Sequence, residues 1–118
     1  MSDVSELEAY RLPVETVVAR LVGLAGVVVT GSVGNVKDER SVRQWVAGER
    51  RPERERQLRF AYHIASMIAA TCGPIVVQSW FKGANTSLGD RAPALVLRDD
   101  FSEDTQLRIL NAARRLMQ

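Results

Sequence analysis

Two residues of the types that catalysis and metal binding use most often, His63 and Cys72, each occur once in this chain. His63 has no cysteine, histidine or carboxylate neighbour at the spacing of metal ligands, so we predict no metal site. A single histidine leaves no convincing Ser-His-Asp or Cys-His arrangement for nucleophilic catalysis. Residues 31–34, Gly-Ser-Val-Gly, lack the lysine and the spacing of a phosphate-binding loop. We therefore predict a protein that is not an enzyme and that needs no cofactor.

A second group of residues is suited to binding nucleic acid. Residues 37–59 hold eight cations and five anions, an excess of three, while the whole chain has a net charge of +2. Cationic side chains bind phosphates and guanine edges, and glutamine pairs with adenine. The predicted DNA-contacting residues are Lys37, Arg40, Ser41, Arg43 and Gln44. The alternative is a solvated helix surface whose arginines pair with neighbouring glutamates.

A third group lies in residues 80–97, which read WFKGANTSLGDRAPALVL. A Trp-Phe pair precedes a polar link rich in turn-forming residues, and a second short apolar run follows it. Large apolar anchors beside a tight loop suit a docking surface better than a catalytic pocket. This stretch is the main candidate for contact with another protein.

The elements that position these groups are predicted to be helices. Residues 1–12 are expected to be a loose lead-in, and Pro13 to start the first helix. Residues 25–36 stay undecided between strand and helix, because valines favour a strand while glycines weaken a helix. Asp38 can cap a helix over residues 39–47, with Val42, Trp45 and Val46 on its apolar side.

The second half of the chain has clearer helix signals. The longest helix is predicted over residues 52–70, charged at first and then apolar all round, which is typical of a buried helix. Pro74 starts another helix to about residue 81, a short one follows at 92–97, and Ser102 caps a last one over 103–116. We predict an all-α protein of about seven helices, in which two substructures share the long helix.

Composition limits the remaining possibilities. The 118 residues include 46% hydrophobic and 25% charged residues, which is ordinary for a soluble globular protein. The single cysteine cannot form an internal disulfide and favours a reducing compartment. The acidic, polar first residues do not resemble a signal peptide, and the longest apolar run is too short to span a bilayer. We expect a cytoplasmic protein with no membrane segment.

Two blocks of sequence together resemble the Xre-like antitoxins of the Xre/MbcA/ParS group, which are partners of RES-domain toxins. The first block is VKDERSVRQWVAGERRPERERQLRFAYHIASMI, similar to a degenerate helix-turn-helix. The second is SWFKGANTSLGDRAPALVL, similar to the toxin-binding domain of that family. The resemblance covers roughly residue 13 to the end. It implies an Xre-like helix-turn-helix domain over residues 13–72 and a small helical toxin-binding domain over residues 73–118.

The resemblance also implies a function. Antitoxins of this family bind a NAD⁺-consuming RES toxin, block access to its active site and, in many members, bind their own operator. Carried onto this chain, Trp80 would pack beneath the loop, Asn85 would organise the turn, and Gly89 would supply an unusual backbone angle. The toxin-binding residues would be Trp80, Asn85, Leu88, Gly89, Arg91, Pro93 and Leu97.

Each of these residues also has a purely structural interpretation. Trp80 suits the core, Gly89 and Pro93 can serve local geometry, and Arg91 can be solvated. The chain departs from many relatives at Ala84, where they have proline before the asparagine. The alternative function is a stand-alone helix-turn-helix transcriptional regulator. Either function suits a homodimer, and the first adds a hetero-oligomer with the toxin.

Overall fold

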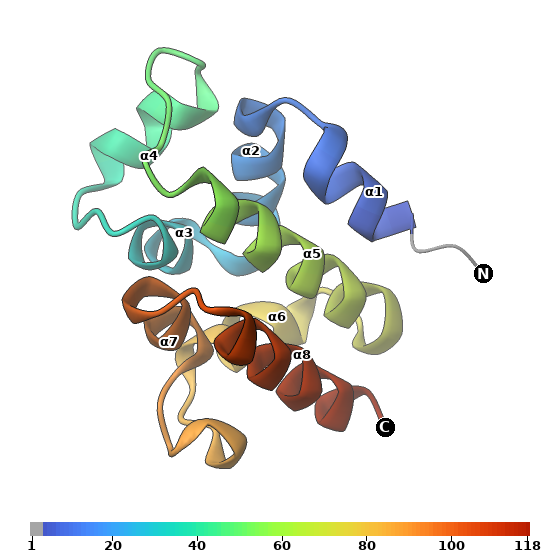
Figure 1. Ribbon diagram of the computed structural model, residues 1–118. Coiled ribbons are helices and arrows are strands. Elements are labelled where there is room, and N and C mark those ends of the chain that lie inside the picture. Colours follow the sequence, from blue (N-terminus) through green and yellow to red (C-terminus); the bar gives the residue numbers. More distant parts are fainter. Residues whose placement is uncertain (1–3) are drawn as a thin grey trace.

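The structure, a computed structural model, describes residues 4–118, and side chains from residue 8 onward. Within this range every helix or strand element is a helix, so the fold is all-α as predicted (Figure 1). The elements are α1 (Val4–Arg11), α2 (Val14–Ala25), α3 (Val27–Val33), α4 (Glu39–Val46), α5 (Glu55–Cys72), α6 (Ile75–Lys82), the 3-10 helix η1 (Thr86–Leu88), α7 (Pro93–Asp99) and α8 (Glu103–Met117).

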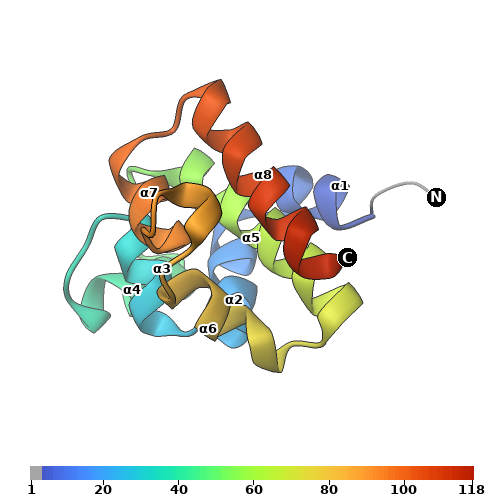
Figure 2. The same cartoon turned by 90° about the horizontal axis from the view of Figure 1, so that it is seen from below.

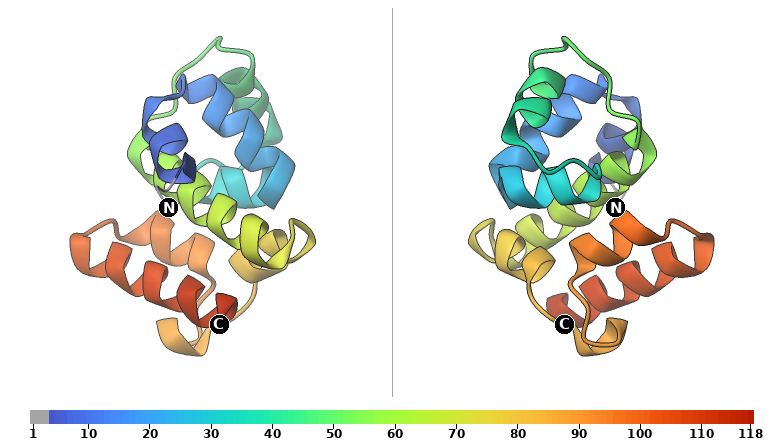
Figure 3. Two further views of the ribbon diagram at one scale, coloured as in Figure 1. Left: turned by 90° about the vertical axis from the view of Figure 1, so that its right-hand side faces the viewer. Right: turned by 90° about the vertical axis from the view of Figure 1, so that its left-hand side faces the viewer.

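Helix α5 lies between the two halves of the molecule. It packs against α1 and α2 on one side and against α6, α7 and α8 on the other (Figure 3). Its buried side chains lie mainly between Leu58 and Ile68, where apolar residues face both halves. One continuous hydrophobic core includes Val17, Trp45, Ile64, Leu97 and Ile109, so apolar contacts cross the expected boundary after residue 72.

The prediction of a loose lead-in over residues 1–12 is wrong for the part of it that the structure describes. Val4–Arg11 form α1, and Ala9 is fully buried. The guanidinium of Arg59 on α5 donates hydrogen bonds to the carbonyl oxygens of Ala9 and Leu12, at 2.9 and 2.8 Å. These carbonyls have no partner inside a helix that ends there, so a distant arginine caps α1.

The undecided segment over residues 25–36 is mostly helical. Gly26, at a φ of +91°, separates α2 from α3, and the hydroxyl of Thr30 donates to its carbonyl oxygen at 2.8 Å. Val29 and Val33 point into the core. Burial of these valines outweighs the weak helix propensity of a segment rich in valine and glycine.

The last three helices begin at the predicted signals. Pro93 occupies the first turn of α7, and the Ser102 hydroxyl accepts a hydrogen bond from the amide of Thr105 at 3.2 Å, which caps α8. In the view from below, α7 lies beside α3 (Figure 2), and the two helices are in contact. The N-terminal and C-terminal halves therefore meet directly as well as through α5.

Candidate interaction surfaces

The segment from α3 to α4 forms a helix-turn-helix pair. The chain changes direction at Asn35, which has a φ of +61°. The amide of Val36 then donates to the carbonyl oxygen of Gly31 at 2.8 Å. A Cβ atom on Gly31 would lie 3.2 Å from the carbonyl oxygen of Val36 and 3.6 Å from the side chain of Val42. A small residue at this position therefore lets the turn fold back on α3.

Trp45 fixes the angle between the two helices. Its side chain is 2% exposed, and its ring lies so close to Gly34 that a Cβ there would meet two ring atoms at 2.5 and 2.8 Å. The Trp45 Nε1 donor is buried without a hydrogen-bond partner among the residues that the structure describes. Packing of the ring, and not a polar contact, thus holds α4 against α3.

The outer face of α4 carries part of the predicted DNA-contacting set. Arg40 and Arg43 are exposed and Gln44 is half-buried, while Lys37 is exposed in the turn before the helix. Arg43 forms an ion pair with Glu39 at 2.8 Å, which reduces the positive charge of this face. Arg40 and Lys37 form no ion pair within residues 8–118.

Ser41, the remaining residue predicted to contact DNA, does not belong to this outer face. It is buried, and its hydroxyl donates to a carboxylate oxygen of Asp38 at 2.8 Å. This hydrogen bond is the main cause that lowers the pKa of Asp38 below its usual value. Asp38 precedes α4 as expected, yet its side chain binds Ser41 and caps no backbone amide. Val46 was predicted to face inward, but it is 38% exposed.

Most arginines of the basic region hold the fold together. Arg51 and Arg59 both pair with Glu55, at 2.8 and 2.9 Å, and these pairs lower the pKa of that carboxylate against the opposing effect of burial. The other contacts are those of Arg50 with Ser41, Arg54 with the carbonyl of Arg98, and Arg56 with the ring of Phe101. The excess charge of residues 37–59 is therefore less available to a partner than its count suggests.

The loop between α6 and α7 is organised by Asn85. Its side-chain oxygen accepts from the amide of Ser87 at 3.0 Å, and its carbonyl oxygen accepts from the amides of Leu88 and Asp90, both at 2.9 Å. Its own amide donates to the carbonyl of Arg91 at 3.2 Å. The predicted organising role of this asparagine is confirmed, because one residue bonds both ends of the turn.

Two consecutive residues in the loop have left-handed backbone angles. Gly89 has a φ of +66° and Asp90 a φ of +63°. No atom lies within 4 Å of a Cβ built on Gly89, so only the backbone angle favours glycine there. Gly89 and Asp90 are both exposed, and they form the tip of the loop.

The apolar residues of the predicted toxin-binding set lie beneath the loop. Leu88 is 2% exposed and Leu97 is fully buried, and Pro93 is also buried. Trp80 is partly buried against the core, with its ring edge-on to Phe81 at 5.1 Å between centroids. The direct contacts expected of Leu88 and Leu97 are therefore unavailable in this conformation, and these side chains support the loop from inside.

Arg91 is exposed, and ion pairs tie it to α7. Its guanidinium donates to Asp99, which also accepts from the Arg98 Nε at 2.7 Å. These bonds, led by the one from Arg98, lower the pKa of Asp99 from 3.8 to about 2. On the other side of the loop, Arg115 of α8 donates to the hydroxyl of Ser87 at 3.0 Å. The loop is thus bonded to both α7 and α8.

No family model, no curated protein and no solved structure matches this chain. The assignment of a function therefore depends on the geometry of these surfaces and on the resemblance of the two sequence blocks.

Helix α6 carries an exposed apolar side chain that was not predicted from the sequence. Ile75, in the first turn of α6, is 89% exposed and lies beside Gln78, Ser79 and Lys82 on a shallow groove that reaches the start of the loop. No sequence signal distinguishes this isoleucine from the buried ones.

In residues 8–118, no three His, Cys, Asp or Glu side chains are grouped to hold a metal. None of the described helices has the length and apolarity needed to cross a bilayer.

Proposed function

We propose that this protein is an antitoxin that binds a NAD⁺-consuming RES-domain toxin and blocks its active site with the loop over residues 82–93. The observation that carries the proposal is the hydrogen-bonded loop itself. An exposed loop that is already held in one shape loses little conformational entropy on binding, which favours recognition of another protein. The resemblance of residues 79–97 to a toxin-binding domain supplies the identity of that partner.

The exposed residues of the loop provide the contact in this proposal. Arg91 and Asp90 offer charges of both signs at the tip, and Asn85 is half-buried beside them. Arginine is enriched among the residues that contribute most to interface affinity. Leu88, Pro93 and Leu97 act indirectly, because they keep the loop seated on α7 and α8.

The first test is whether the adjacent open reading frame encodes a RES-type protein, and the second is co-expression of this chain with that toxin. The wild-type protein is expected to co-purify with that toxin and to prevent the fall in cellular NAD⁺. Arg91→Ala is expected to weaken the complex by roughly tenfold, the effect of losing one well-placed charged contact. Arg114→Ala on α8 removes another exposed arginine outside the loop and is expected to protect like wild type. Folded wild-type protein that neither binds the toxin nor preserves NAD⁺ would contradict the proposal.

A second candidate function is DNA binding by α4, favoured by the close packing of Trp45 on Gly34 in a helix-turn-helix pair. Lys37, Arg40, Arg43 and Gln44 are the contacts in this proposal. Because several of these contacts reach phosphates, binding to the region upstream of the gene is expected to weaken steeply with salt. Electrophoretic mobility shift assays measure the affinity for this DNA. Arg40→Ala is expected to weaken binding, and Arg114→Ala is the control. Binding that stays constant from low to high salt would count against this candidate.

A further inference from the structure

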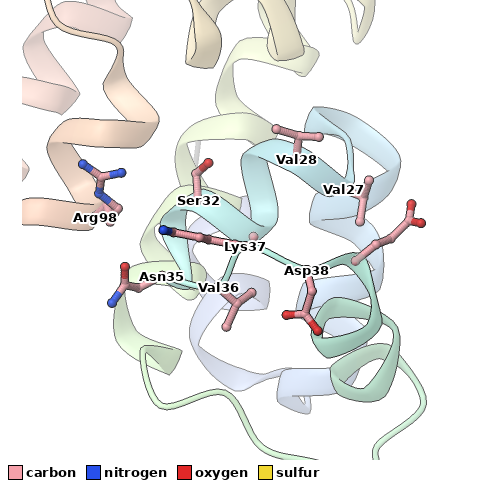
Figure 4. A pocket seen from close by; sticks show the side chains of 10 residues that line it. Val27, Val28, Ser32, Asn35, Val36, Lys37, Asp38 and Arg98 are labelled. Atoms are coloured by element: carbon pink, nitrogen blue, oxygen red, sulfur yellow. The ribbon is translucent and has the colours of Figure 1, made fainter.

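A pocket of about 420 Å³ lies where the two halves of the molecule meet. It is formed by α3, by the turn before α4 and by the end of α7, which is more than half the chain away in sequence (Figure 4). Its volume falls within the range of small-ligand sites. Its lining combines an apolar wall, made by Val27, Val28 and Val36, with a group of polar and charged side chains.

Two cations line the same side of this pocket. In Figure 4 the side chain of Lys37 extends toward the side where Arg98 lies, and the labelled side chains of Ser32 and Asn35 lie above and below its ammonium end. Lys37 forms no ion pair within residues 8–118. Like charges that line the same side of a recessed site repel, and an anion bound there reduces the repulsion.

The guanidinium of Arg98 is held in place on this side. Its Nε and Nη2 donate to the carboxylate of Asp99 at 2.7 and 3.3 Å, which leaves Nη1 without a bond to any described residue. The carbonyl oxygen of Arg98 accepts from Arg54, so its backbone is fixed as well. Asp99 shares its charge with Arg91, so it only partly neutralises Arg98.

The two acidic residues that line the pocket bond to side chains of α4. Asp38 accepts a hydrogen bond from Ser41 at 2.8 Å, and Figure 4 shows its carboxylate at the end away from Arg98. Glu39 is paired with Arg43 at 2.8 Å. Positive charge therefore dominates one side of the pocket, and the apolar lining includes Val28, which is 63% exposed.

We propose that Lys37 and Arg98 clasp a phosphate group, to which Ser32 and Asn35 also donate hydrogen bonds. The valine wall would contact the organic part that carries the phosphate. Guanidinium and ammonium groups together with neutral donors are the usual partners of phosphate oxygens. The phosphate can belong to a small phosphate ester or to the backbone of a nucleic acid. Arg98 shares Asp99 with Arg91 of the toxin-binding loop, so Lys37→Gln is the variant that tests this site separately from the antitoxin function.

Titration of the purified protein with phenyl phosphate tests the site. Two-dimensional NMR is expected to show saturable shifts for the amides of Ser32, Asn35 and Lys37. Lys37→Gln and Arg98→Gln are each expected to weaken binding by about tenfold, as expected from the loss of one charge-assisted hydrogen bond. Lys37 is exposed and unpaired, so its variant is expected to keep the fold. Lys82→Gln and Arg114→Gln remove the same charge elsewhere and are expected to bind like wild type.

A short DNA duplex of random sequence forms the second arm of the test. Saturation by phenyl phosphate with no effect of the duplex identifies a small ester as the ligand. Binding of the duplex that weakens in Lys37→Gln and Arg98→Gln but not in the controls, without saturation by phenyl phosphate, identifies a nucleic-acid phosphate. Shifts at these amides from neither probe, or equal losses in the control variants, would overturn the proposed site.

Discussion

The α3–α4 unit and the loop over residues 82–93 both reach the surface, but they are stabilised in different ways. In the α3–α4 unit, a buried tryptophan packed on a glycine sets the geometry, and its indole Nε1 has no hydrogen-bond partner among the described residues. In the loop, hydrogen bonds from Asn85 and ion pairs through Asp99 set the geometry. In the first unit a packed ring sets the geometry, whereas the loop has polar contacts in addition to the buried side chains of Leu88, Pro93 and Leu97.

On α4, the residues that set the geometry differ from those proposed to contact a partner. In the loop, the same residues do both. On α4, the outward arginines can be changed without touching the contact between Trp45 and Gly34. In the loop, Asn85 and Arg91 both hold the backbone and belong to the proposed contact surface. Variants of α4 can therefore test recognition alone, while variants of the loop need a measurement of folding beside each measurement of binding.

The largest effect is expected for Gly34→Ala. The added Cβ would lie 2.5 and 2.8 Å from ring atoms of Trp45, which is itself buried and cannot move freely. Overpacking of this kind is expected to lower the free energy of unfolding by about 2 kcal/mol. Chemical denaturation measures it. Gly23→Ala is the matched control, because nothing lies within 4 Å of its Cβ, and it is expected to stabilise α2 by roughly 0.5–1 kcal/mol. Equal effects of the two substitutions would show that Trp45 does not set the helix angle.

The next effect concerns the tip of the loop. Gly89→Ala is expected to cost about 1 kcal/mol of folding free energy, because its φ of +66° is unfavourable for a residue with a Cβ. Gly89→Asn is expected to cost less, since asparagine tolerates this angle better. Thermal denaturation of both variants measures the difference. If alanine costs no more than asparagine, the left-handed angle is not what this position requires.

A similar or slightly smaller effect is expected for Asn85→Ala. It removes the side-chain bond to the amide of Ser87 and leaves the backbone bonds of residue 85 in place. Loss of one capping bond is expected to cost about 1 kcal/mol. Amide hydrogen exchange across residues 85–91 is expected to speed up, while exchange in α5 stays unchanged. Thr86→Ala is the control, since Thr86 is exposed and its side chain makes no bond to the residues described.

The elements that sequence predicts well are those with local signals. The helices at residues 52–70 and 103–116 have apolar periodicity, and the second has a serine cap that the structure contains. Helix α1 could not be predicted in this way, because the arginine that caps it lies 47 and 50 residues away from the carbonyls it binds. Helix α3 was undecided because its stability comes from burial of valines against other elements.

In the candidate sites too, only the features with local sequence signals could be predicted. The turn chemistry of Asn85 and Gly89 is local, so the sequence indicates it. Leu88 and Leu97 were assigned to a contact surface because apolar residues of a core and of an interface are alike in sequence. Arg98 was missed entirely, since its position with Lys37 in the lining of one pocket exists only after α7 packs beside α3.

The smallest effect is expected in the titration of Asp99, and it tests whether ion pairs hold the loop. The lowered pKa of Asp99 favours the folded state above the ordinary value of 3.8, and this contribution is lost as the pH falls toward about 2. Carboxyl-carbon NMR is expected to follow this titration directly. Arg98→Gln is expected to raise the pKa of Asp99 more than Arg91→Gln does, because the bonds from Arg98 are the larger cause. A larger rise in Arg91→Gln would mean that the loop arginine, and not its neighbour on α7, is the main partner of Asp99.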